Sequence, residues 1–304
     1  MCLSMSVYAT ESITILTGGT NGIYYPLGIA LSSIYTKVIH DSKIAVIATK
    51  GSVENLNMLE SGEGEVAISL GDSLSDAYSG NEEAGFSVPL KHLRTIGALY
   101  PSYIYFVATA DSGIKSFEDM KGKRISVGAL KSGSELNSRV ILNAAGMSYN
   151  DFSKVEYLSY TESVQLMKNK QLDVMLLSSG ADISALRNLS KSQKIVFLSI
   201  PEDVIKKIGD PAYQVGIIPA HTYEDQAKDI HTVKVENFLV THSELSDETV
   251  YLMTRAMFEN LDQMVSSHVA AKAINLDDAI KNLPVPLHPG AAQYYKEMGL
   301  ILPE

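Results

Sequence analysis

The chain has 304 residues, of which 45% are hydrophobic and 20% are charged, with 25 Lys and Arg against 35 Asp and Glu. This composition is typical of a globular protein and excludes a mainly disordered chain, and the length suggests two domains or one large one. The formal charge of −10 excludes a nucleic-acid-binding protein, because binding to phosphates depends on Lys and Arg side chains that neutralise them.

The N-terminal residues have features of an export signal that is cleaved by signal peptidase. Residues 1–9 (MCLSMSVYA) are small and apolar, and Val7-x-Ala9 fits the pattern that signal peptidase cleaves. We interpret them as the remnant of an export signal or as a disordered terminus. Cys2 is the single cysteine, which excludes an intrachain disulfide and a cysteine-based metal site. No uninterrupted apolar stretch reaches the roughly 18–20 residues that cross a bilayer.

The first part of the chain alternates strand and helix signals. Apolar runs alternate with segments in which apolar residues recur every three or four positions. The pattern predicts a strand at Ile13–Leu16, a helix from Pro26, a strand at Lys43–Thr49, a helix from about Ser52 to Ser61 and a strand at Glu65–Leu70. A β-α-β-α-β order requires a parallel sheet with covering helices.

The same order then recurs about 110 residues later along the chain, so we expect two similar α/β lobes rather than a stack of short repeats. The second unit is predicted to contain a strand at Arg124–Gly128, a helix through Leu136 and Ala144, a strand near Val155–Ser159, a helix around Glu162–Lys168 and a strand at Asp173–Ser178.

Two apolar segments are predicted to connect the lobes, Tyr103–Thr109 on the way out and Val235–Thr241 on the way back. The chain would then cross twice and leave a cleft between the lobes. We assign residues 10–107 with 230–304 to lobe 1 and residues 108–229 to lobe 2. The chain from Asp247 reads as helices, whereas Leu283–Gly290 contains three prolines and is predicted to be an extended, packed loop.

The loops after the strands are where an open α/β sheet binds ligands. They are rich in Gly, Ser, Thr and Asn, and most lead into a helix N-terminus, whose free N–H groups and positive dipole end suit a carboxylate. Facing loops from two lobes would enclose a small anionic or zwitterionic solute. These loops are Thr17–Tyr25, Lys50–Asn55, Gly71–Ser73, Ala129–Ser134 and Ser178–Asp182.

Each of these features also has a purely structural interpretation. Ser132-x-x-Glu135 matches a capping box, and Ser52 and Asp72 resemble helix N-caps, which only stabilise helices. Tyr24 and Tyr25 lie between a Gly-rich turn and a proline, where they face either the core or the loop side. The hypothesis of a ligand site therefore depends on several helix ends coinciding.

Enzymatic signatures are scarce. Thr17–Gly22 matches the dinucleotide fingerprint only in part, and the next strand ends in Thr49-Lys50, without a carboxylate for a ribose. No nucleophile-elbow, zinc-protease or P-loop sequence occurs. Ser112-x-x-Lys115 lacks its partner motifs, and His288 is interpreted as a hydrogen-bonded packing residue.

Six segments taken together resemble the TAXI family, the extracytoplasmic solute receptors of TRAP transporters. The resemblance runs from about Ile13 to the C-terminus, and the first and last of the six segments are the most specific in combination. They are TGGTNGIYYPLG at 17–28, GSVENL at 51–56, KGKRISVGALKSGSE at 121–135, IPAHTY at 218–223, VYLMTRAMFEN at 250–260 and PLHPGAAQYY at 286–295.

The resemblance implies a periplasmic, exported receptor with the two-lobe type II periplasmic binding-protein fold, a hinge and an inter-lobe cleft. Such a receptor closes on glutamate, glutamine or a related dicarboxylate or 2-oxo acid and delivers it to a TRAP membrane permease. It would be a monomer that binds a small organic acid or amino acid, uses no cofactor and no metal, and catalyses nothing. The implied ligand-binding residues are Thr20, Asn21, Tyr24, Tyr25, Ser52, Asn55, Asp72, Ser132, Gly133, Ser134 and Gly180.

Within that set, Ser132, Gly133 and Ser134 would form the anion loop of lobe 2, and Asp72 would bind an ammonium group if the ligand is an amino acid. The sequence departs from the family pattern at Leu70-Gly71-Asp72, where relatives carry a Gln-Ser-Asp-like stretch. It also has Gly180-Ala181-Asp182 in place of a Gly-x-Pro turn, and Asp182 would repel a second carboxylate if it faced the cleft.

Two other classes of function remain open on the sequence. One is a nucleotide-dependent oxidoreductase that uses the same cleft, which would bind a nucleotide at Thr17–Gly22. The other is a surface-exposed immunogenic protein that no longer transports, in which the cleft would be closed or blocked.

Overall fold

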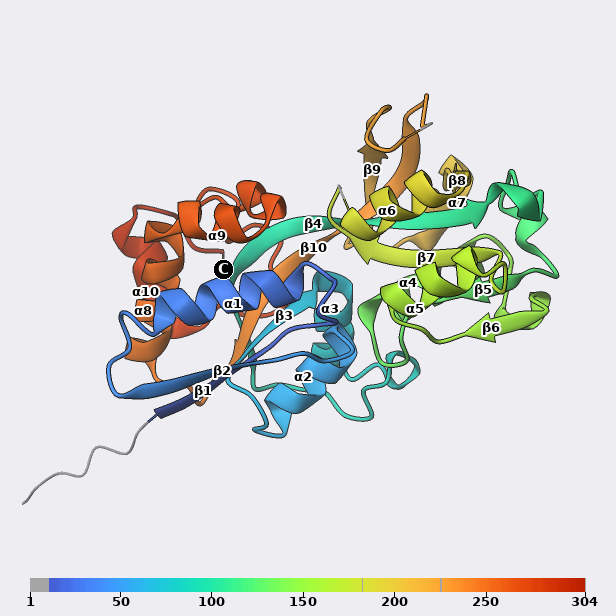
Figure 1. Cartoon of the computed structure of the whole chain (residues 1–304). Helices are drawn as coiled ribbons and strands as arrows, with labels where there is room; N and C mark the ends of the chain where they lie inside the picture. The colour runs from blue at the N-terminus through green and yellow to red at the C-terminus, as the bar shows by residue number, and fades with distance from the viewer. Residues whose placement is uncertain (1–10, 182, 225, 304) are drawn as a thin grey trace, which may run out of the picture.

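The computed structural model describes residues 11–181, 183–224 and 226–303. The expected export segment, residues 1–9, and Asp182 lie outside this range. Helices pack on a mixed sheet that extends through two lobes, and two long strands connect the lobes (Figure 1). The expected α/β two-lobe architecture is confirmed.

Lobe 1 begins with the predicted β-α-β-α-β unit. β1 (Glu11–Leu16) pairs in parallel with β2 (Ser42–Ile47) and β3 (Val66–Leu70), and α1 (Tyr24–Tyr35) and α2 (Ser52–Glu60) connect them. All five residues of β3 are buried, as expected for a central strand. α3 (Gly71–Ser79) follows β3 without a loop, so the predicted loop Gly71–Ser73 is instead the first turn of a helix.

Lobe 2 repeats this arrangement. β5 (Arg124–Ser126) lies between β6 (Lys154–Glu156) and β7 (Val174–Ser179), all parallel, with α4 (Gly133–Ala144) and α5 (Tyr160–Lys168) as connections. β5 and β6 are shorter than the strands predicted at Arg124–Gly128 and Val155–Ser159. The remaining α-helices and strands in the described part of this lobe are α6 (Ser184–Ser192), β8 (Ile195–Leu198), α7 (Glu202–Ile208) and β9 (Gln214–Ile218).

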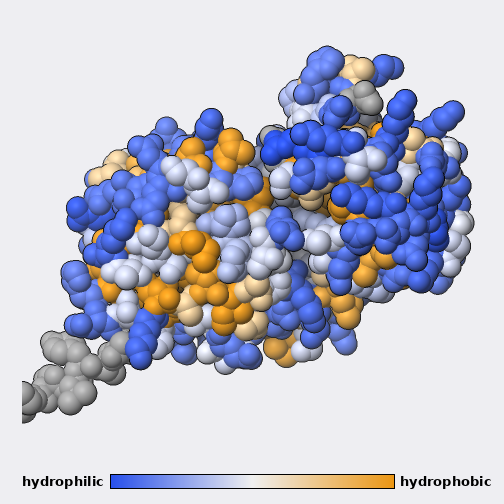
Figure 2. Space-filling model, viewed as in Figure 1, coloured by the Kyte–Doolittle hydropathy of each residue, from blue (hydrophilic) through white to orange (hydrophobic). Residues whose placement is uncertain are grey.

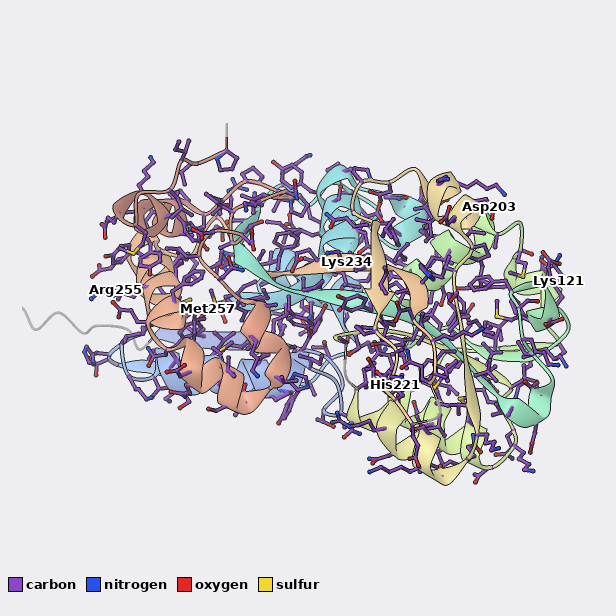
Figure 3. The ribbon with its side chains drawn as sticks, turned by 90° about the horizontal axis from the view of Figure 1, so that it is seen from above. Lys121, Asp203, His221, Lys234, Arg255 and Met257 are labelled. Atoms are coloured by element: carbon purple, nitrogen blue, oxygen red, sulfur yellow. The ribbon has the colours of Figure 1, made fainter. Side chains whose placement is uncertain are left out.

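The predicted double crossing is made by two strands that are longer than expected, β4 (Leu93–Thr109) and β10 (Ile230–His242). β10 pairs antiparallel with β3 of lobe 1, and β4 pairs antiparallel with β7 of lobe 2. The two crossing strands therefore join the sheets of the two lobes. The strand order is β2-β1-β3-β10-β4-β7-β5-β6. In Figure 3, Lys234 marks β10 between the lobe of Met257 and the lobe of His221.

The crossing strands are irregular where they leave lobe 1. Pro101 pairs with Glu236 and Ala98 pairs with Phe238, so two residues of β4 face Asn237 alone, which is a β-bulge. Proline has no N–H for the ladder and is tolerated in a strand at such an irregularity. The bulge and Pro101 therefore interrupt the regular ladder between the crossing strands.

The end of the chain returns to lobe 1 as α8 (Asp247–Glu259), α9 (Leu261–Ser267) and α10 (Pro289–Glu297). Their apolar faces pack with α1, β1 and β3 in one core cluster. The prediction of a loop through Gly290 was wrong at its end, because Pro289 starts α10, where its missing N–H costs nothing. His288 is fully buried and caps α10 by accepting a hydrogen bond from Gly290 N, which confirms its packing role.

Hydrophilic side chains cover most of lobe 2 on the face shown in Figure 2, and apolar side chains gather mainly over lobe 1. Within the part of the chain that the structure describes, no helix is both long enough and apolar enough to cross a bilayer.

Candidate functional site

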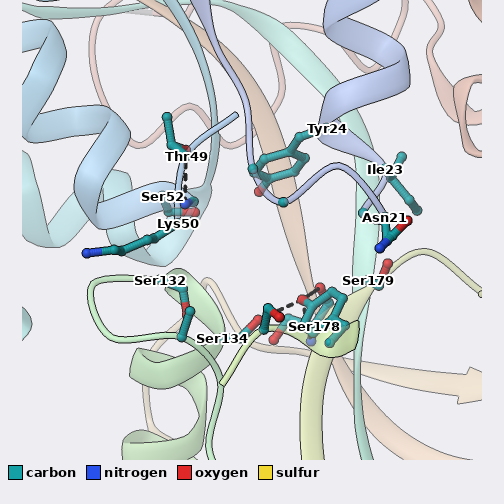
Figure 4. A pocket seen from close by; sticks show the side chains of 18 of the residues that line it. Asn21, Ile23, Tyr24, Thr49, Lys50, Ser52, Ser132, Ser134, Ser178 and Ser179 are labelled. Atoms are coloured by element: carbon teal, nitrogen blue, oxygen red, sulfur yellow. Dashed lines mark hydrogen bonds between the residues drawn. The ribbon is translucent and has the colours of Figure 1, made fainter. Parts of the chain in front are cut away.

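A cavity of about 520 Å³ lies between the two lobes. Figure 4 shows Thr49, Ser52 and Tyr24 of lobe 1 on one side and Ser132, Ser134 and Ser178 of lobe 2 on the other. The lining residues are Gly18–Tyr24, Thr49–Ser52, Leu70, Tyr100, Ala129, Leu130, Ser132–Ser134, Tyr157, Ser159–Glu162, Ser178 and Ser179.

Four helices begin at this cavity. α1 and α2 bring Tyr24 and Ser52 from lobe 1, and α4 and α5 bring Gly133 and Tyr160 from lobe 2. The first N–H groups of a helix have no intrahelical acceptor, and each N-terminus carries about half a positive charge. Each N-terminus therefore places partial positive charge at the cavity wall, and the first turns of α2, α4 and α5 each carry a glutamate that counters it, Glu54, Glu135 and Glu162.

Few charged side chains line the cavity. Among the lining residues, all of which belong to the described part of the chain, Lys50 and Glu162 are the charged ones. Lys50 is exposed and lies 3.9 Å from the Glu54 carboxylate. The Glu162 carboxylate accepts hydrogen bonds from Ser159 N and Oγ at the start of α5, which lower its pKa. A bound anion would be held by N–H and hydroxyl groups rather than by a salt bridge.

The hydroxyls on the lobe 2 side are fixed by hydrogen bonds. Tyr160 OH is 2.8 Å from Ser134 Oγ, donates to Ser178 O at 2.6 Å and accepts from Ser178 N at 3.2 Å. Burial raises the pKa of Tyr160, so its phenol stays neutral and can donate. Tyr160 thus connects the first turn of α4 to the end of β7.

Tyr24 connects the cavity to the bulge in the crossing strands. Its OH donates to Asn237 Oδ1 at 2.5 Å, and Asn237 Nδ2 donates to Tyr100 O at 2.7 Å and to Ser102 Oγ at 2.8 Å. Tyr100 lies in the bulge, so this side-chain amide donates to a carbonyl at the irregular part of the ladder. Burial raises the pKa of Tyr24 well above its ordinary value.

The lobes also contact each other directly around the cavity. Asn21 Nδ2 donates to Thr161 Oγ1 at 2.6 Å, and Glu54 N donates to Lys131 O at 3.1 Å. Gly133 has no room for a side chain, because a Cβ there would lie 2.6 Å from Leu70 Cδ1 and 2.8 Å from Ser52 Oγ.

Seven of the predicted ligand-binding residues line the cavity, and the structure brings them together from both lobes. They are Thr20, Asn21, Tyr24, Ser52, Ser132, Gly133 and Ser134.

Four predicted residues do not line the cavity. Asn55 is fully buried behind it, and its Nδ2 donates to Thr17 O and Ile68 O. Both Asp72 carboxylate oxygens accept hydrogen bonds from protein groups. Tyr25 is half-buried on α1, and Gly180 is buried, where a Cβ would lie 2.8 Å from Ile23 Cδ1.

Two of the predicted helix caps were wrong. Gly51, with φ 117°, is the N-cap of α2, and Ser52 Oγ instead accepts from Leu70 N at 3.1 Å. Leu70 is the N-cap of α3, and Asp72 lies inside its first turn. Ser132 caps α4 as predicted, but the Glu135 carboxylate pairs with Arg139 instead of completing a capping box.

The segment Tyr157–Glu162 is the largest part of the lining that the sequence analysis missed. It runs from the end of β6 into the first turn of α5, and its Ser159-x-x-Glu162 forms a capping box with both hydrogen bonds present. That motif was visible in the sequence and marks a helix N-terminus after a strand, the same context as the other lining segments.

Comparisons with known proteins agree with this architecture. A model of the NMT1-like family matches residues 15–299. The structure is similar to PhnD1 from Prochlorococcus marinus (MIT 9301) in complex with methylphosphonate, with a TM-score of 0.61, 12% identity and coverage of 96% of this chain and 97% of that one.

Two further solved structures are similar over nearly their whole length. A protein from Bordetella bronchiseptica RB50 has a TM-score of 0.60 and 14% identity, with 95% of this chain and 98% of that one covered. The periplasmic binding protein BugD has a TM-score of 0.58 and 11% identity, with 96% and 94% covered. These likenesses show that the chain has the two-lobe fold of periplasmic solute-binding proteins.

Proposed function

The chain belongs to the NMT1-like family, and we propose that it is a solute receptor that closes its two lobes on one small organic anion. The observation that carries this proposal is the convergence of four helix N-termini, two from each lobe, on one cavity. A carboxylate placed there would receive hydrogen bonds from both lobes at once.

Closure follows from how such contacts are distributed. An anion that touches both lobes makes more contacts in the closed arrangement than in an open one, so binding shifts the population toward the closed state. The crossing strands β4 and β10, with Pro101 and the bulge opposite Asn237, supply the hinge in this account. No covalent step is required, so the protein would act as a receptor and not as an enzyme.

The finer assignment rests on the sequence resemblance. We propose that the chain is an extracytoplasmic TAXI receptor that delivers its solute to a TRAP membrane permease. Its solute would be glutamate, glutamine or a related dicarboxylate or 2-oxo acid. The PhnD1 complex with methylphosphonate supports the proposal, because it shows that a protein of similar fold binds a small anion.

A thermal-shift screen of paired acids and amides tests the proposal. The panel would contain monocarboxylic, dicarboxylic and 2-oxo acids and amino acids, each paired with the derivative in which every carboxylate is converted to an amide. An acid at 100 times its Kd should add about 2.7 kcal/mol to the free energy of unfolding, whereas its amide should add much less. NAD and NADP should have no effect.

Stabilisation by amides equal to that by acids would contradict the role of the helix N-termini. Stabilisation by a nucleotide alone would favour the oxidoreductase alternative. If no member of the panel stabilises the protein, the proposal of a small organic acid is wrong.

A further inference from the structure

A second polar cluster lies behind the cavity, around Asp72 in the first turn of α3. The side chain belongs to lobe 1 and the residue is 3% exposed. Its Oδ2 accepts hydrogen bonds from two residues of lobe 2, Asn137 Nδ2 at 2.6 Å and Tyr213 OH at 2.7 Å. Its Oδ1 accepts one from Ser73 N at 2.7 Å. One carboxylate therefore holds donors from both lobes.

Asn137 extends this cluster to the cavity. It is fully buried on α4, and its Oδ1 accepts a hydrogen bond from Ser178 Oγ at 2.5 Å. Its Nδ2 also donates to Tyr213 OH at 2.8 Å. Ser178 lines the cavity, whereas Asp72, Asn137 and Tyr213 do not. A continuous hydrogen-bonded path thus runs from the wall of the cavity to the carboxylate of the opposite lobe.

We propose that Asp72 is a positioning residue whose carboxylate latches the two lobes together, and that Ser178 and Asn137 couple this latch to the solute. The inference rests on the proposed function, because it concerns the closure of the same receptor. It replaces the expectation that Asp72 binds an ammonium group of the ligand, since both carboxylate oxygens already have protein donors.

Asp72 can act as a latch because separation of the lobes would break its hydrogen bonds with Asn137 and Tyr213 of lobe 2. In the closed arrangement the carboxylate is out of water, and the hydrogen bonds from Asn137 and Tyr213 offset part of the cost of burying its charge. Protonation removes the rest of that cost. Hydrogen bonds to charged groups are stronger than those between neutral groups, and removing one partner from a buried charge is costly. The hydrogen bonds of one buried network also strengthen one another when every polar group in it has a partner.

The groups that face Asp72 are mostly acidic or neutral. Burial raises its pKa from 3.8 to about 6, and the charges of Asp76 on the same helix and of Asp210 add to that effect. The hydrogen bonds from Tyr213 and Ser73 lower its pKa but do not cancel the effect of burial.

The remaining elements packed nearby add phenols and one ion pair. The Tyr213 and Tyr24 phenols stay neutral because burial raises their pKa values. α4 contributes the neutral Asn137 and also carries the ion pair between Arg139 and Glu135.

The raised pKa of Asp72 predicts the direction in which the Kd for the solute changes with pH. Opening returns the carboxylate to water and to its ordinary pKa, so closure takes up a proton between about pH 4 and pH 6. Acidification through this window therefore favours the closed state. We expect the Kd of the wild-type protein for its solute to fall by about tenfold from about pH 7.5 to about pH 5, and Asp72→Asn to abolish that dependence.

The decisive variant is Tyr213→Phe, because it removes the hydroxyl that donates to Asp72 and keeps the aromatic ring in the core of lobe 2. The separation of the lobes would be measured with two spin labels, attached at Glu63→Cys and Lys168→Cys in a Cys2→Ser background. Both positions are exposed, and they lie on opposite lobes. Distances would be measured without and with L-glutamate. Tyr213→Phe should lower the share of short distances and raise the Kd for L-glutamate by about tenfold to hundredfold.

Tyr223→Phe is the matched control, since Tyr223 is also a buried tyrosine of lobe 2 and its OH donates to Ala181 O of the same lobe at 3.2 Å. It should leave the distances unchanged. A distance distribution of Tyr213→Phe identical to that of the wild type in both conditions would overturn the latch. A shifted distribution without binding of any acid would leave the latch standing and contradict the proposed function, so the two failures are distinguishable.

Discussion

Gly133→Val is expected to raise the Kd for the solute by about hundredfold, because overpacking a closed contact costs up to about 3 kcal/mol. Gly133 is the first residue of α4 and faces lobe 1. A Cβ at this position would overlap Leu70 Cδ1 at 2.6 Å, Ser52 Oγ at 2.8 Å and Ser73 Oγ at 3.1 Å. Because these three neighbours all belong to lobe 1, the substitution obstructs closure and leaves the packing within lobe 2 intact.

Calorimetric titration and the melting temperature together check this prediction. The ligand-free variant should melt within a few degrees of the wild type, since only the contact between the lobes is changed. Asn143→Val is the control, because it places the same β-branched side chain at an exposed position of α4. Wild-type affinity in Gly133→Val would show that the lobes do not approach each other as described.

Asn237→Leu should lower the free energy of unfolding by about 3–5 kcal/mol, because it leaves several buried polar groups without partners. Asn237 is fully buried, and its side chain holds Tyr24 OH, Tyr100 O and Ser102 Oγ. Leucine has a similar size but no polar atoms, so the cost comes mainly from unmade hydrogen bonds. Urea unfolding measures the loss, and the same variant should weaken solute binding because Tyr24 loses its orientation.

Tyr24→Phe provides a graded comparison for this prediction. It removes one of the three hydrogen bonds and should cost about 1–2 kcal/mol, less than Asn237→Leu. If both variants are equally stable, Asn237 does not organise the bulge. If Asn237→Leu unfolds like the wild type, the hydrogen-bonded cluster at the crossing strands contributes nothing to the fold.

The layered α/β order could be predicted because it depends on local patterns. Val66–Leu70 and Val174–Ser179 are short apolar runs bounded by polar turns, and such runs identify buried strands without knowledge of their partners. Element ends were harder to predict, because tertiary contacts decide them. Gly71 continues directly into a helix, and Pro289 starts one, although each position looked like part of a loop.

The cavity lining could be predicted in part for the same reason. Small polar residues before a helix are visible in a sequence, so Ser132–Ser134 and Thr20-Asn21 were found. The role of Asp72 could not be found this way, since its partners Asn137 and Tyr213 lie 65 and 141 residues away along the chain. Only the approach of the two lobes brings these groups together.

Calorimetric titration of an acid and of its neutral amide into the wild-type protein tests the central claim most directly. The account predicts saturable binding of one acid per chain, with an amide that binds far more weakly, because helix N-termini of both lobes place partial positive charge at the cavity wall. Equal affinity for the acid and the amide, or no saturable heat from any small acid, would contradict it.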